Sequence, residues 1–201
     1  MSVVSSRFTS VLMPLALVSL AAFSLPAHAD WLLNPQASDL SFVSIKKNSI
    51  AETHHFKELS GSISDAGAFS LSIKLASVDT GIAVRDERMR NMLFDTAMFP
   101  SASVSGKTPA NDYTSLPPGT SRIENLKFSL DLHGKNIELT SKVRVTSLSN
   151  NKLLISTVQP VIVDASSFDL VAGIEKLREV AQLPAISTAV PVTLILVFDR
   201  Q

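Results

Sequence analysis

Apolar and polar residues alternate with a period of two along much of the chain after residue 30. The clearest runs span residues 126–132 and 137–145, and His133-Gly134 lies between them. Nearly every second position in both runs is leucine, isoleucine, valine or phenylalanine, which is typical of strands with one buried face. Glycine supplies the positive φ that a tight two-residue connection needs. The pattern therefore predicts a β-hairpin.

Similar runs predict further strands, and the period changes to that of a helix in two places. The additional strands are expected over residues 31–33, 40–45, 56–63, 69–75, 101–107, 153–163 and 190–198. A charged segment at 85–90 and an amphipathic segment at 170–183 have helical character, and Pro184 ends the second. That helix is a candidate cover for the apolar last strand. Roughly eight strands with short connections predict an all-β protein with minor α content, either an antiparallel barrel or a sandwich.

The first 29 residues have the features of a cleaved export signal. Arg7 precedes an apolar run from Val11 to Leu25, and Ala27-His28-Ala29 supplies small residues at a cleavage site. The alternative is a membrane anchor, but a span needs about 20 apolar residues. We therefore expect cleavage before Asp30 and, in a Gram-negative host, a periplasmic protein without a stable membrane span.

The mature chain, residues 30–201, has the length of one domain that can bury a core without disulfide bonds. Arg7 is the only charged side chain before residue 30, so 17 basic and 18 acidic side chains remain. This near-neutral balance gives no reason to expect a nucleic-acid partner. The chain has no cysteine, which excludes disulfides and thiolate chemistry. The oligomeric state is left open, and the apolar last strand would suit either a core or a dimer contact.

The most specific segment is SVDTGIAVRDERMRNMLFDTAMFP, residues 77–100. It combines a polar turn, a short charged helix and two phenylalanines before the next strand. This block resembles that of the YceI-like family. LSF at 40–42, FKELSGSI at 56–63 and LDLHGKNIEL at 130–139 extend the likeness over nearly the whole mature chain. The resemblance implies one lipocalin-like, roughly eight-stranded antiparallel barrel with one or two short covering helices, which binds a polyisoprenoid lipid. Residues 48–51 and the helix at 170–183 depart from the family pattern.

The resemblance favours a hollow barrel, and its lining is then expected on the apolar faces of the strands. An eight-stranded barrel is either filled by its own side chains or wide enough for one ligand, and the residues alone do not separate these outcomes. Phe94 and Phe99 are expected to anchor the helical cap or to narrow the mouth. The other predicted ligand-binding residues are Phe42, Phe69, Leu71, Ile73, Phe128, Leu130, Leu139 and Val143.

Asp79, Arg85, His54 and His55 are the candidate polar residues at the mouth or in its loops. Arg85 either belongs to a solvated helix face or meets a polar lipid head, and Asp79 is expected to pair with the arginines of the segment, as is Asp86. Neighbouring residues on a strand point to opposite faces. His54 and His55 are therefore not expected to bind one metal, and they fit a polar rim better.

The sequence contains no hydrolase elbow, zinc-protease motif or phosphate-binding loop. We therefore expect a non-enzymatic carrier without metal or cofactor, whose partner is an isoprenoid or another long-chain apolar lipid. Two alternatives stay open: a ligand-free β-domain that serves stress or interaction roles, and an enzyme that acts on an apolar substrate inside the barrel.

Overall fold

The structure is a computed structural model that describes residues 29–201, apart from 65, 109–112, 114 and 150. The predicted signal lies outside the described residues except for Ala29, where the first strand begins. In the described part of the chain, no helix is long and apolar enough to cross a membrane.

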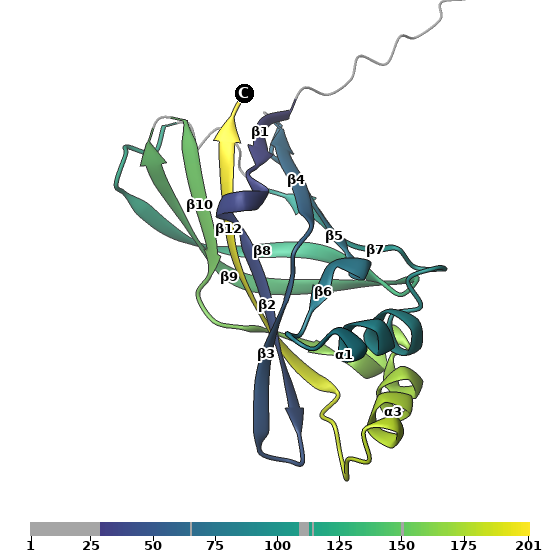
Figure 1. Cartoon of the computed structure of the whole chain (residues 1–201). Coiled ribbons are helices and arrows are strands. Elements are labelled where there is room, and N and C mark those ends of the chain that lie inside the picture. The colour runs from purple at the N-terminus through teal and green to yellow at the C-terminus, as the bar shows by residue number, and fades with distance from the viewer. Residues whose placement is uncertain (1–28, 65, 109–112, 114, 150) are drawn as a thin grey trace, which may run out of the picture.

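Eight antiparallel strands form a closed ring (Figure 1). The ring closes because β1 pairs with β4 on one side and with β12 on the other. In ring order the strands are β1 (Ala29–Leu33), β4 (Leu59–Ser64), β5 (Ala68–Lys74), β7 (Ser101–Lys107), β8 (Ser121–Leu132), β9 (Lys135–Ser149), β10 (Lys152–Thr157) and β12 (Ala189–Arg200). The prediction of an eight-stranded antiparallel barrel with minor α content is confirmed.

Four shorter or branching strands extend the wall at one end: β2 (Asp39–Lys46), β3 (Ile50–Phe56), β6 (Val78–Asp79) and β11 (Val161–Asp164). Strand β12 pairs with β1 and β10 near its C-terminal end, and with β2 and β11 nearer its start. A 3-10 turn at Pro35–Ala37 separates β1 from β2, and Pro160, which lacks an N–H donor, lies between β10 and β11. The wall is therefore interrupted twice, between β1 and β2 and between β10 and β11. Beyond these breaks, the barrel widens toward the β2–β3 hairpin.

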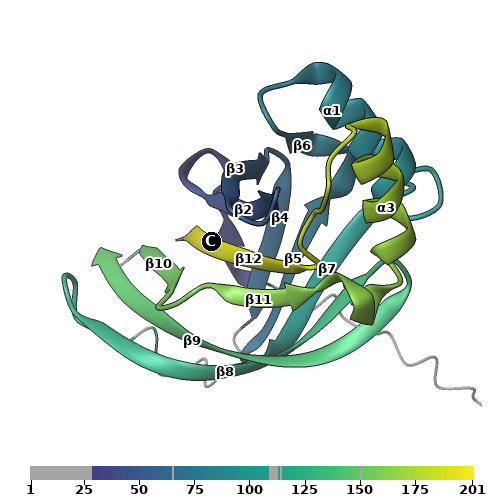
Figure 2. The same cartoon turned by 90° about the horizontal axis from the view of Figure 1, so that it is seen from below.

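The β8–β9 hairpin has the predicted two-residue turn. His133 and Gly134 have φ values of 53° and 74°, and Leu132 pairs with Lys135 directly beside the turn. Positive φ at both central positions is the conformation that matches the twist of an antiparallel pair. This hairpin is the longest stretch of wall and curves around one side of the barrel (Figure 2).

Two short helical segments lie side by side at the widened end (Figures 1 and 2). The first is α1 (Ala83–Arg88), which continues into a π-helical turn, η3 (Met89–Leu93); the second is α3 (Val171–Val180). They meet closely because Gly173 has no side chain: a Cβ there would lie 2.7 Å from the Met92 carbonyl oxygen. Helix α3 has its main contacts with η3, and it faces the start of β12 across a cavity lined by Ile174, Leu177 and Val190.

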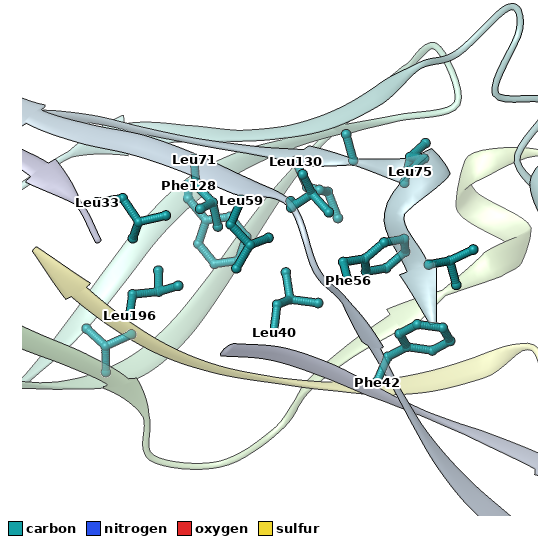
Figure 3. Close-up of a cluster of buried hydrophobic side chains, with 14 of the residues drawn as sticks. Leu33, Leu40, Phe42, Phe56, Leu59, Leu71, Leu75, Phe128, Leu130 and Leu196 are labelled. Atoms are coloured by element: carbon teal, nitrogen blue, oxygen red, sulfur yellow. The ribbon is translucent and has the colours of Figure 1, made fainter. Parts of the chain in front are cut away.

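Inward-pointing apolar side chains from all parts of the ring form one core cluster. Figure 3 shows Leu40 and Phe42 of β2, Leu71 of β5, Phe128 of β8 and Leu196 of β12 pointing into the same space. The period-two pattern of each strand produces this arrangement because alternate side chains of a closed barrel point inward.

Candidate ligand-binding site

The barrel interior contains an apolar cavity of about 230 Å³, here called the inner chamber. None of the described lining residues is charged, and the polar side chains among them are Ser70, Thr108, Ser141, Thr157 and Tyr113. For comparison, an engineered apolar cavity of about 150 Å³ stays dry and binds benzene. The inner chamber can therefore accept a hydrocarbon segment rather than being completely filled by side chains.

The inward-facing residues also show that the chamber is open. Val104 and Leu139 line it, yet both remain only half-buried. Leu71, which pairs with Val104, and Val143, on the same strand as Leu139, are fully buried. Inward side chains that keep some accessible surface are expected in a hollow barrel and not in a close-packed core. The interior is thus partly packed and partly free.

The structure brings nine of the ten predicted ligand-binding residues to the inner chamber: Phe42, Phe69, Leu71, Ile73, Phe94, Phe128, Leu130, Leu139 and Val143. Phe69 owes its place to Gly106 on the neighbouring strand, because a Cβ at Gly106 would lie 2.6 Å from the Phe69 ring. Their contact with a ligand stays a prediction.

Phe99 does not line the inner chamber. Its ring lies 4.3 Å from the ring of His133 and covers the β8–β9 turn at Gly134. Phe94, by contrast, is buried and packs against Phe56 at a ring-centroid distance of 5.7 Å. Of the two predicted anchors, Phe94 joins the cap to the chamber, and Phe99 joins the segment after it to the hairpin.

A second cavity of about 370 Å³, the mouth chamber, lies between α1, η3, α3 and the β2–β3 hairpin. Four residues line both chambers, so the two adjoin: Phe42, Leu93, Ile174 and Val190. Unlike the inner chamber, the mouth chamber has charged walls, supplied by Lys46, Glu52, Arg85 and Arg88.

The inner face of β2 and β3 changes character along its length. On β2 the order is Phe42, Ser44, Lys46, and β3 places His54 opposite Phe42 and Glu52 opposite Ser44. Apolar, hydrogen-bonding and charged side chains thus follow one another from the inner chamber toward the hairpin tip. This gradient belongs to the ordinary alternation of two strands, because every second residue of each strand faces inward.

His54 is a buried polar residue on this face, with 2% of its surface exposed. Its Nε2 lies 2.9 Å from the Ser44 hydroxyl, and its ring packs edge-on against Phe42 at 5.3 Å. Burial, followed by the positive charge of Arg85, lowers the pKa of His54, which favours the neutral imidazole. Its Nδ1 is buried and has no hydrogen-bond partner among the described residues.

Arg85 fixes α1 to the hairpin. Its Nη1 donates to Glu52 Oε2 at 2.7 Å, and its Nη2 donates to the Thr80 carbonyl at 2.6 Å. The same Glu52 oxygen lies 2.8 Å from Lys46 Nζ, and the hydrogen bond from Lys46 is the main cause that lowers the Glu52 pKa. The Nε of Arg85 is buried without a partner among the described residues. A buried polar atom left unpaired costs about 1–3 kcal/mol, so both this nitrogen and His54 Nδ1 call for an explanation.

The other two predicted mouth residues lie outside both chambers. His55 points to the opposite face of β3, where Nδ1 lies 2.8 Å from Asp39 and 45% of its side chain is exposed. Asp79 pairs with Lys57 at 2.7 Å, and the hydrogen bond from Lys57, assisted by the Gly81 N–H, lowers the Asp79 pKa.

The expectation that Asp79 and Asp86 pair with the nearby arginines is wrong. Asp86 accepts hydrogen bonds from the backbone N–H and the hydroxyl of Thr80, at 2.8 and 2.5 Å. Asp86 therefore stabilises the turn before α1. Arg85 pairs instead with Glu52, which is far away in sequence.

Sequence reasoning missed Ser44, Lys46, Glu52 and Arg88 of the mouth chamber. They could have been found by continuing the two-residue alternation of β2 past Phe42, to Ser44 and Lys46, and by applying the same alternation to the paired residues of β3. Among the described residues, no group of three or more histidine, aspartate or glutamate side chains is arranged to hold a metal ion.

A closed antiparallel barrel with an apolar interior cavity is the architecture of proteins that enclose one small apolar ligand. Residues 31–198 match the YceI-like domain, and the chain belongs to that family. No curated protein sequence matches the chain.

Solved structures agree with this assignment. A polyisoprenoid binding domain from Saccharophagus degradans, implicated in plant cell wall breakdown, is 38% identical with a TM-score of 0.85, and the alignment covers 87% of this chain and 100% of that one. BcnA from Burkholderia cenocepacia is 19% identical with a TM-score of 0.65, covering 82% and 98%. The YCEI protein of Campylobacter jejuni is 14% identical with a TM-score of 0.54, covering 74% and 84%. The last two similarities concern the fold alone.

Proposed function

We propose that the protein is a periplasmic carrier that holds the apolar tail of an isoprenoid-type lipid in the inner chamber. The observation that carries the proposal is the inner chamber itself, a cavity inside the barrel whose described lining has no charged side chain. The 38% identical domain from Saccharophagus degradans, which binds polyisoprenoids, supports the ligand class. A binding role is favoured over an enzymatic one because the described part of this lining offers no histidine, carboxylate or lysine for acid–base catalysis.

The physical basis of binding is burial of hydrocarbon. Each methylene removed from water contributes about 0.8 kcal/mol, so one five-carbon unit contributes about 4 kcal/mol before the costs of binding. Ordering of the chain and immobilisation of the ligand remove part of this gain. Pockets for small ligands measure about 300–1,000 Å³, and the inner chamber, at about 230 Å³, is smaller. A long polyprenyl tail therefore has to extend into the mouth chamber or widen the barrel when it binds.

Export of the carrier rests on the signal-like residues 1–29. The family match starts at residue 31, directly after the predicted signal. A carrier in the periplasm would shield a tail from water while it moves between membranes. Cell fractionation and N-terminal sequencing test this part, with a mature N-terminus at Asp30 as the expected result.

The ligand is tested by native mass spectrometry of the full-length protein expressed in its own host. We expect an added mass that disappears after organic extraction and that is identified in the extract as an isoprenoid lipid. The protein refolded from denaturant without lipid is the matched reference.

Protein that carries no lipid from its own host, and that takes up none from isoprenoid-containing vesicles, would contradict the carrier function. That result would favour the ligand-free β-domain. Chemical conversion of an added isoprenoid, lost in a His54→Gln variant, would instead favour an enzyme.

A further inference from the structure

Two unpartnered nitrogen atoms belong to residues that line the mouth chamber. They are His54 Nδ1 and Arg85 Nε, both buried and without a hydrogen-bond partner among the described residues. The two side chains are close enough for the Arg85 charge to act on the imidazole. Their remaining polar atoms are used: the Arg85 terminal nitrogens bind Glu52 and Thr80, and His54 Nε2 meets Ser44.

The chemistry of these atoms defines what would satisfy them. The Nε of arginine can only donate a hydrogen bond, whereas Nδ1 of a neutral histidine donates or accepts according to its tautomer. If the Ser44 hydroxyl donates to Nε2, the ring hydrogen lies on Nδ1, and both free nitrogens then donate. Oxygen atoms that accept hydrogen bonds would match both sites.

The charge of the walls points the same way. Among the described lining residues, three cations, Lys46, Arg85 and Arg88, stand against one carboxylate, Glu52, and that carboxylate already pairs with two of them. The chamber therefore has an excess of positive charge, which favours an oxygen with partial or full negative charge.

We propose that the mouth chamber binds the polar head of the lipid, and that an acceptor oxygen of the head receives hydrogen bonds from Arg85 Nε and His54 Nδ1. The inference rests on the proposed carrier function, since it is the inner chamber that holds the tail. Phe42, Leu93, Ile174 and Val190 line both chambers, so a head in one and a tail in the other occupy adjoining spaces. A carbonyl oxygen of a quinone ring and a phosphate oxygen share this acceptor chemistry.

Three synthetic probes with the same fifteen-carbon isoprenoid chain test the proposal on the delipidated mature protein. The first carries a benzoquinone ring, the second is the diphosphate, and the third is the hydrocarbon without a head. Binding is measured by competition with a fluorescent fatty acid analogue.

We expect at least one head-bearing probe to bind about tenfold more tightly than the hydrocarbon, as one hydrogen bond to a charged group would give. The preferred probe identifies the source of the oxygen as carbonyl or phosphate. Equal affinity for all three probes overturns the head-group site and leaves the carrier function intact. Failure of all three to bind overturns the carrier function and the head-group site together.

Conservative variants assign the effect to the two nitrogens. Arg85→Lys keeps the positive charge but has no Nε, and we expect it to lose about tenfold in affinity for the preferred head-bearing probe without a change for the hydrocarbon. Arg90→Lys, in the same charged segment but outside both chambers, is the matched control and should bind all probes like the wild type.

At position 54, substitution by Gln or by Asn separates the roles of the two ring nitrogens. Gln places its amide near the Nε2 position beside Ser44, whereas Asn places its amide near the Nδ1 position. We expect His54→Gln to lose about three- to tenfold for the head-bearing probe and His54→Asn to retain more of the affinity. An equal loss for the hydrocarbon in these variants would mean that they disturb the chamber as a whole, and it would overturn the assignment. His55→Gln, on the opposite face of β3, is the control.

Discussion

The inner and mouth chambers share four lining residues but differ in what their other inward positions carry. On β8 the side chains that line the inner chamber are Leu126, Phe128, Leu130 and Leu132, all apolar. On the β2–β3 hairpin the inward positions change from Phe42 to Ser44 and Lys46, with His54 and Glu52 on the paired strand. Both walls have the same two-residue period.

The difference shows that the alternation decides where a side chain points, and the residue type decides which part of a ligand it meets. A hydrocarbon chain gains by leaving water and needs only apolar area. A polar head loses its hydration when it enters the barrel, so it needs hydrogen-bond partners in return. One sheet can provide both when its inward residues change along the strand.

The largest expected effect comes from a charge in the inner chamber. Phe128→Asp would bury a carboxylate where none of the described lining residues is a cation, so we expect loss of bound lipid together with a loss in unfolding free energy of several kcal/mol. Native mass spectrometry and thermal unfolding measure the two effects. Phe69→Asp should act in the same way.

Lys127→Asp is the control for Phe128→Asp, because Lys127 is exposed on the same strand, and it should retain lipid. Unchanged lipid content in a folded Phe128→Asp or Phe69→Asp protein would refute the lining assignment.

A substitution that fills part of the inner chamber tests whether the barrel is hollow or packed. Val104→Phe adds volume at a half-buried inward position. In a hollow barrel it should reduce lipid uptake strongly while changing the unfolding free energy by less than about 1 kcal/mol, whereas overpacking a full core costs about 1–3 kcal/mol.

Ser105→Phe, at the exposed neighbouring position on β7, is the reference for Val104→Phe. A strongly destabilised Val104→Phe protein with normal lipid content would show that the interior around this residue is already full.

The mouth chamber should respond more weakly to a change in Glu52, the carboxylate among its described lining residues. Glu52→Gln removes the group shared by Lys46 and Arg85. All three side chains are partly exposed, so we expect a loss of about 1 kcal/mol or less in unfolding free energy. Urea unfolding measures it, and Glu58→Gln, whose exposed carboxylate pairs with Lys74, is the control. A loss of several kcal/mol would mean that the cap depends on this one contact.

The smallest expected effect is a change in pH dependence. Because the His54 pKa is lowered in the folded state, the unfolded chain binds a proton here before the folded protein does. The contribution of His54 is complete above the unfolded value of about 6.5 and declines as the pH falls below it.

Thermal unfolding between pH 7.5 and 5.5 tests this contribution in a range where Glu52, with its lowered pKa, stays ionised. We expect His54→Gln to lose less stability on acidification than the wild type. An identical dependence in both proteins would mean that His54 does not take up the proton in this range.

The outcomes of the sequence predictions differ between the two regions for a physical reason. The strands of the inner chamber were predicted because apolar residues mark their buried faces, as in Phe69–Leu75 and Leu126–Leu132. Strand β3 was not recognised as a separate strand, because its inward positions hold Glu52 and His54 and therefore lack the apolar signal. The same residues that make the mouth chamber polar hide it from a hydrophobicity pattern.

The pairing of charges also escaped prediction. Arg85 has Asp86 as its neighbour in sequence, but its carboxylate partner is Glu52, 33 residues earlier. Local spacing favours contacts within one helix, whereas the actual partner is brought close by packing of α1 against the hairpin.

By itself, the sequence determined the strand period, the His133-Gly134 turn, the two short helices and the family block at residues 77–100, because each depends on residues close together in the chain. Only the tertiary structure decided that β1 closes the ring against β12, some 165 residues away, and that the interior keeps two adjoining chambers. Ring closure and cavity size depend on how strands distant in sequence meet and how completely their side chains fill the space between them, and no local pattern specifies either.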